Sequence, residues 1–156
     1  MAPTAIVAGD VNVGELASFW FGAVVRGDVA PVTIGRRVNV QDNAVVHVDT
    51  DVPNVIEDDV VIGHGAIVHG KFVGRGSLIG MGATVLSRTT IGRECLIAAG
   101  AVVPPDLEVP DGMVVMGVPG KIVRPVKDEE LQYMRWLTGH YVELAEKYVR
   151  EGFGAD

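Results

Sequence analysis

The chain has 156 residues, a formal net charge of −7 and a pI of about 5.0, with 48% hydrophobic and only 6% aromatic residues. This length corresponds to one domain, and the acidic balance argues against nucleic acid or an anionic membrane surface as a partner. The sequence has no apolar run of about 20 residues and no signal-peptide pattern, so we expect a cytoplasmic protein without a membrane-spanning segment.

The first 125 residues are dominated by an aliphatic residue at every sixth position. The series begins with Val7, Val13, Phe19 and Val25, and it continues through residues 34–46, 56–68 and 73–115. Neither a helix nor a two-residue alternation gives this period, whereas hexads build a parallel β-helix with one short strand per hexad. Gly often follows the aliphatic residue, where we expect it to relieve backbone strain at the corners. The sequence predicts an all-β solenoid domain over residues 1–125.

Cys95 is the only cysteine of the chain, which excludes an intrachain disulfide framework. It follows Ile91 by four residues, at a small position of the hexad that faces inward. We therefore expect a buried structural thiol rather than a nucleophile.

A helical segment is predicted over residues 126–156, with acidic side chains in its first turn. We expect its apolar stripe to pack along the solenoid and help to cap it, with part of the stripe available to a neighbouring subunit. The alternative is a helix that recruits a partner. Gly139 is expected to bend or split this segment, and His140 is interpreted as a surface or interface residue. The stripe consists of Leu131, Met134, Leu137, Tyr141, Leu144 and Tyr148.

Two histidines of the repeat occupy one column of the predicted solenoid. The step from Val46 to Val68 is one coil of three hexads plus four residues, and the surplus lies in a polar loop at residues 49–53. His47 and His69 therefore point outward from stacked positions about 4.8 Å apart. At that spacing two imidazoles can converge on one tetrahedral zinc. Arg26 falls in the same column one coil earlier.

His64 lies outside this column, because it follows Ile62 on the preceding face and a corner separates it from His69. It can complete a three-His site if a second subunit packs its own His64 against the column, and three subunits around a three-fold axis would close three such sites. Three protein ligands leave a position for water, which favours a catalytic metal over a structural one. The alternative is that all three are ordinary surface histidines.

Four further polar residues cluster in the same coils. Gln41 is placed to hydrogen-bond a metal-bound hydroxide or a substrate oxygen, and Asp42 to orient a ligand imidazole. Arg26 and Asp28 are candidates for pairing across the subunit boundary. A strand-edge amide for Gln41, and a purely structural salt bridge between Arg26 and Asp28, are the alternatives.

In these residues the chain resembles the γ-class carbonic anhydrase family over nearly its whole length. The resemblance implies a left-handed β-helix, a homotrimer, and zinc, iron or cobalt held by His47 and His69 of one subunit with His64 of its neighbour. It also implies that Arg26 and Asp28 serve interface pairing and site architecture, and that Gln41 and Asp42 line the site. The matching motifs include Val25-Arg26-Gly27-Asp28-Val29, Asn39-Val40-Gln41-Asp42-Asn43, Ile62-Gly63-His64, Val68-His69-Gly70 and Gly117-Val118-Pro119-Gly120-Lys121.

The implied reaction is the reversible hydration of carbon dioxide to bicarbonate, with a metal hydroxide as nucleophile. The chain departs from the best-known members in having a short segment after His47, which offers only Asp49 and Asp51 as acids, and in having Val29 where they carry a glutamate. Two other functions stay open. One is an acyltransferase or thioesterase acting on coenzyme A derivatives, and the other is a metal-binding structural or assembly subunit with little activity.

Overall fold

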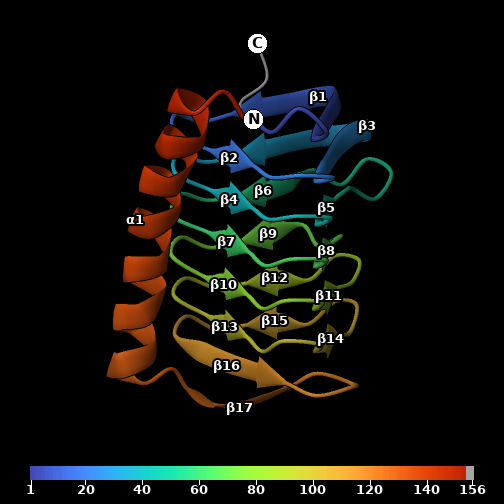
Figure 1. Cartoon of the computed structure of the whole chain (residues 1–156). Coiled ribbons are helices and arrows are strands. Elements are labelled where there is room, and N and C mark those ends of the chain that lie inside the picture. The colour runs from blue at the N-terminus through green and yellow to red at the C-terminus, as the bar shows by residue number, and fades with distance from the viewer. Residues whose placement is uncertain (154–156) are drawn as a thin grey trace.

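The hexads form the coils of a left-handed parallel β-helix, which the computed structural model describes over residues 1–153 (Figure 1). Three faces run the length of the solenoid, and strands one coil apart pair in parallel on each face. The two long strands β1 (Ile6–Val13) and β3 (Val24–Ile34) turn a corner and join two of the faces into one sheet. The predicted fold class is therefore confirmed.

The remaining strands are short and fall on the three faces in rotation. Face A contains β5 (Val45–Val46), β8 (Ile67–Val68), β11 (Thr84–Val85) and β14 (Val102–Val103). Face B contains β6 (Asn54–Ile56), β9 (Phe72–Val73), β12 (Thr90–Ile91) and β15 (Glu108–Val109). Face C contains β2 (Ser18–Phe19), β4 (Asn39–Val40), β7 (Val61–Ile62), β10 (Leu78–Ile79), β13 (Leu96–Ile97), β16 (Met113–Met116) and β17 (Lys121–Pro125).

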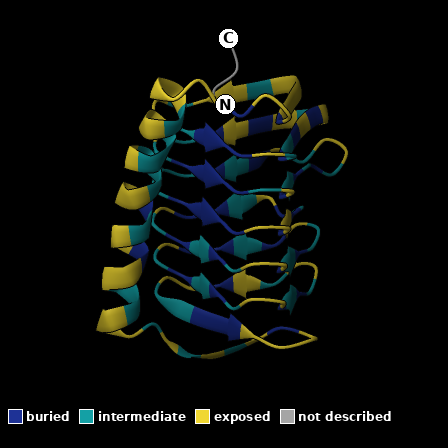
Figure 2. Ribbon diagram, in the orientation of Figure 1, coloured by how far each residue is buried: buried dark blue, intermediate teal, exposed yellow. Residues whose placement is uncertain are grey.

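The core is the narrow interior of the prism, filled by the aliphatic position of each hexad (Figure 2). Val25 has no exposed surface, yet its register partner Val7 is 36% exposed and Val13 is 48% exposed. Val7 and Val13 occupy the predicted register, but they belong to the first coil, which has another coil on one side only. Cys95 is buried in the same interior, and burial raises the pKa of its thiol.

The corner glycines serve a different purpose from the one expected. Gly74 does not have a positive φ, so it relieves no left-handed strain. A Cβ on Gly74 would lie 2.6 Å from the carbonyl carbon of Gly92 in the next coil. The small residue is therefore required because the backbones of successive coils approach closely at this corner.

The C-terminal segment forms one uninterrupted helix, α1 (Asp128–Arg150), so the expectation that Gly139 splits it is wrong. The helix lies along face C, against β2, β4 and β7, with Met134 and Thr138 buried underneath. The packing of α1 on these strands offsets the modest cost of one glycine in a helix. Part of the predicted segment, residues 154–156, lies outside the described residues.

Two features close the C-terminal end of the solenoid. Strand β17 runs antiparallel to β16, an addition that the hexad pattern does not predict. Arg124 on β17 then makes a bidentate ion pair with Glu130 in the first turn of α1, which connects the last strand to the helix. Over residues 1–153, no helix is long and apolar enough to cross a membrane.

Candidate metal centre

His47 and His69 lie side by side on face A, as the register predicts. Val46 pairs with Val68 in adjacent coils, so the two histidines that follow them are stacked. Their ring centres are 5.1 Å apart, with 38° between the ring planes. Two imidazoles that share a tetrahedral zinc, at Zn–N bonds of about 2.0–2.1 Å, have ring centres about 5 Å apart. The distance between the ring centres is therefore compatible with two ligands of one metal ion.

Each of these rings contacts a carboxylate. Nε2 of His47 donates to Asp28 at 2.8 Å, and Nε2 of His69 donates to Asp49 at 3.0 Å. The hydrogen bond from His47, together with the charge of Arg26, lowers the pKa of Asp28. Each ring could bind a metal through Nδ1 and keep its hydrogen bond to the carboxylate. Binding through Nε2 would replace that hydrogen bond. Carboxylate partners of this kind orient ligand imidazoles.

Asp49 is a site residue whose contacts sequence reasoning missed. Burial raises the pKa of its carboxyl, but hydrogen bonds from Ser87 and His69 outweigh burial and leave the pKa below its usual value. Ser87 donates to Asp49 at 3.0 Å from the loop that follows β11. Ser87 belongs to no recognisable sequence motif, so its contact with Asp49 could not be predicted. The only indication in the sequence was that an acidic residue follows His47 by two positions.

His64 lies on the corner between faces C and A, away from the stacked pair. Asp42 contacts Nδ1 of His64 through Oδ2 at 2.9 Å, which leaves Nε2 of this exposed ring for another group. Gln41 is buried, and its Oε1 accepts the backbone N–H of His64 at 3.1 Å. The structure thus brings Gln41, Asp42 and His64 together as a second cluster.

Arg26 and Asp28 lie one coil above His47. They form an ion pair within this chain, which is the structural alternative given above, and pairing across a subunit boundary stays a prediction. The two residues are close in sequence and lie together on β3. Through its second oxygen, Asp28 links this pair to His47.

Within residues 1–153, no group of three His, Cys, Asp or Glu side chains is close enough to hold a metal ion. A single chain therefore offers two imidazoles on face A and one at the corner. A site that combined all three histidines would therefore need more than one chain, and such a site stays a prediction.

Comparison with known proteins identifies the structural class to which the chain belongs. The family described as "Bacterial transferase hexapeptide (six repeats)" matches residues 70–105, which agrees with the hexad solenoid. A Bacillus cereus crystal structure described as a "putative acetyltransferase" superposes with a TM-score of 0.86 at 38% identity, covering 94% of this chain and 89% of that one. The chain is therefore a hexapeptide-repeat β-helix protein.

The curated relatives of the chain include carbonic anhydrases. Gamma carbonic anhydrase 2, mitochondrial, of Arabidopsis thaliana is 38% identical over 97% of this chain, which spans 56% of that protein. A carbonic anhydrase of Geobacillus kaustophilus is 41% identical over 91% of this chain and 78% of its own length. The chain belongs to the γ-class carbonic anhydrase family. It spans little more than half the length of the plant relative.

Proposed function

We propose that this protein is a metal-dependent carbonic anhydrase that interconverts carbon dioxide and bicarbonate. The observation that carries the proposal is the stacked pair of His47 and His69, whose 5.1 Å ring separation fits two ligands of one tetrahedral metal. When bound, zinc lowers the pKa of a water ligand to about 7, which supplies a nucleophile at neutral pH. Iron and cobalt suit the same imidazole ligands.

The third ligand is proposed to be His64 of a neighbouring chain in a homotrimer. The corner column that contains His64 supports this arrangement, because Met81 lies one coil below it and Phe21 two coils above it, and both are exposed large hydrophobic residues. Backbone hydrogen bonds connect the column from coil to coil through Phe21, Asp42, His64 and Met81. Exposed apolar surface around an exposed imidazole is suited to a subunit interface.

The remaining polar residues have proposed supporting roles. Asp42 holds His64 through Nδ1 and so directs Nε2 outward, while Asp28 and Asp49 orient His47 and His69. Gln41 anchors the backbone of His64 through Oε1, and its amide N–H groups are proposed to bind a substrate oxygen. Arg26 neutralises Asp28 beside the stacked pair.

An acyltransferase acting on coenzyme A derivatives is the second candidate, favoured by the acetyltransferase name of the Bacillus cereus structure and by the family description that matches residues 70–105. A structural or assembly subunit with little activity is the third. The plant relative is named mitochondrial, so a cytoplasmic location stays a prediction.

Metal content and carbon dioxide hydration, measured together, test the proposal. We expect near one zinc-group metal per subunit and metal-dependent hydration in stopped flow. His64→Ala should lose metal binding and activity by more than the roughly 10–100-fold that removal of a supporting partner costs. His140→Ala is the matched control, because His140 stacks on Trp136 on the exposed side of α1. A fully metallated trimer with no rate above buffer would overturn the proposed reaction.

A further inference from the structure

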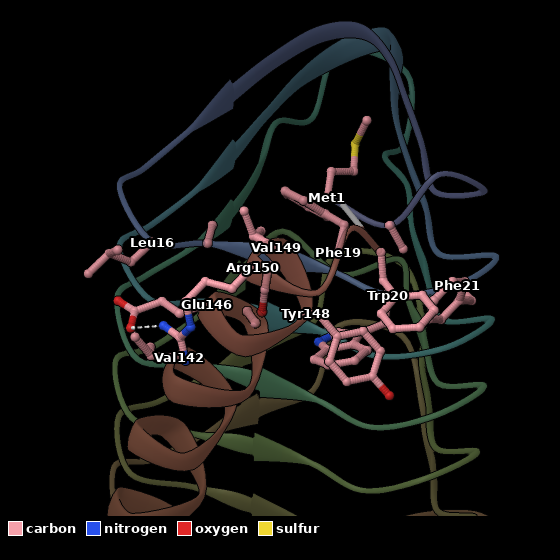
Figure 3. Close-up of a pocket in the computed structure, with 15 residues that line it drawn as sticks. Met1, Leu16, Phe19, Trp20, Phe21, Val142, Glu146, Tyr148, Val149 and Arg150 are labelled. Atoms are coloured by element: carbon pink, nitrogen blue, oxygen red, sulfur yellow. Dashed lines mark ion pairs between the residues drawn. The ribbon is translucent and has the colours of Figure 1, made fainter. Parts of the chain in front are cut away.

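A cavity of about 400 Å³ lies between the first coil and the C-terminal half of α1 (Figure 3). Residues 16–21 form one wall, and helix residues from Val142 to Arg150 form the other, with Phe153 beside them. In Figure 1, α1 is on the opposite side of the solenoid from β5 and β8, so this cavity is separate from the histidine pair. A volume of this size is in the range of small-molecule sites.

The solenoid wall of the cavity presents two buried polar groups. Phe19 points into the core, so its neighbours Ser18 and Trp20 point outward, beneath the helix. Ser18 is 8% exposed and Trp20 is 7% exposed, and both line the cavity. The alternation of β2 therefore places a hydroxyl and an indole N–H on the same wall.

Both groups have a proton to donate. Within the described part of the chain, Nε1 of Trp20 is buried and has no hydrogen-bond partner. The Oγ of Ser18 accepts from Asn39 Nδ2 at 2.7 Å, which leaves the hydroxyl proton of Ser18 for another acceptor. Tyr141 and Tyr148 contact the indole edge to face, and ring faces are only weak acceptors. Buried donors are otherwise almost always paired, so the indole N–H of Trp20 lacks an acceptor.

The side chains of the other walls are largely apolar, and the two charged ones have opposite signs. Leu16, Val142, Val149 and Phe153 supply hydrocarbon surface. The charged residues of the lining, Glu146 and Arg150, lie 3.9 Å from one another and largely cancel. Such a site suits a molecule with a hydrocarbon body and a single polar end.

We propose that this cavity binds a small aliphatic molecule that carries one oxygen acceptor, a medium-chain carbonyl or carboxylate compound. Its chain lies against the apolar walls, and its oxygen accepts from Trp20 Nε1 and Ser18 Oγ. Because the charged pair of the lining is neutral overall, an uncharged carbonyl compound is favoured over a carboxylate. Binding here needs neither the metal nor the histidines.

The indole N–H resonances of ¹⁵N-tryptophan-labelled protein provide a direct test, because the chain has only two tryptophans. Trp136→Phe assigns the resonance of Trp20. We expect 2-octanone to move the Trp20 resonance downfield until the site is saturated, and octanoate to do so more weakly. We expect no downfield shift with n-octane, which has no hydrogen-bond acceptor. No movement of this resonance up to the solubility of 2-octanone, or an equal shift with n-octane, would overturn the proposal.

Two variants test the geometry. Ala145→Phe fills the cavity from the helix side and should abolish the shift, so a shift that survives in a folded Ala145→Phe protein contradicts the site. Trp20→Phe keeps an aromatic ring but removes the donor. It should reduce the ratio of the affinity for 2-octanone to the affinity for n-octane by about 3- to 10-fold, which corresponds to the free energy of one neutral hydrogen bond. An unchanged preference would contradict the role of Nε1.

Discussion

His47 and His69 lie on adjacent coils with ring centres 5.1 Å apart, although a loop intervenes between their strands in sequence. The spacing is set by strand register, because Val46 and Val68 pair directly in β5 and β8. The loop between β5 and β6 closes on itself through a bridge between Asp49 and Val52, so its extra residues leave the column undisturbed. It also delivers Asp49 to His69.

A shared site predicts complementation between inactive variants. His47→Ala retains a usable His64, and His64→Ala retains the stacked pair. When the two chains are co-assembled, some interfaces combine an intact pair with an intact His64. We expect partial recovery of bound metal and of carbon dioxide hydration in the mixture, measured after unfolding and refolding together.

The control for complementation is a mixture of His47→Ala with His69→Ala. His47 and His69 must come from one chain, since they lie on adjacent coils of the same solenoid. No interface in this mixture contains both, so no recovery is expected. Recovery in the control, or none in the His47→Ala and His64→Ala mixture, would contradict a site divided between chains in this way.

Asp42→Asn is predicted to weaken metal affinity by roughly 10- to 100-fold, the usual cost of removing a carboxylate that orients a ligand histidine. The carboxylate contacts His64 Nδ1 at 2.9 Å, and an amide would hold the ring less firmly. Asp51→Asn is the matched control, because Asp51 is an exposed loop residue with a φ of 60° that asparagine also adopts. Competition with a chelator measures both affinities, and equal losses in the two variants would show that charge alone matters.

The sequence predicted the features that depend on period and register. The hexads gave the three faces, the stacking of Val46 on Val68, and the separation of His64 from the pair. The inward position of Cys95 followed from the same count. These inferences succeed because a solenoid converts sequence spacing into distance through nearest-neighbour contacts.

Features that depend on side-chain direction or on the ends of the solenoid were beyond the pattern. Ser87 and Asp49 belong to different coils, and their contact depends on side-chain rotamers, which the spacing of residues in the sequence does not specify. The antiparallel β17 and the exposure of Val13 arise where the repeat stops. The uninterrupted helix through Gly139 reflects tertiary packing on face C, which overrides local propensity.

A matched pair of core substitutions tests the effect of the solenoid end. Val7 and Val25 are register partners at the same hexad position, but Val25 is fully buried and Val7 is 36% exposed. Val25→Ala should cost about 2 kcal/mol of unfolding free energy, and Val7→Ala about 1 kcal/mol or less, because it removes less buried surface and opens no closed cavity. Urea unfolding measures both, and equal costs would indicate that the first coil is covered in solution.

The connection between β17 and α1 predicts a specific acid dependence. Arg124, together with the backbone N–H of Lys127, lowers the pKa of Glu130 from 4.5 to about 2. The stabilisation is therefore present above the unfolded-state pKa and is lost as the pH falls from about 4.5 towards 2. Glu130→Gln should cost about 1 kcal/mol at pH 7, the usual value of a helix-capping contact, and the difference from the parent protein should shrink below pH 4. Urea titrations at pH 7, 4 and 3 measure this trend. A difference that stayed constant over this range would mean that the charge of Glu130 does not stabilise the contact between α1 and β17.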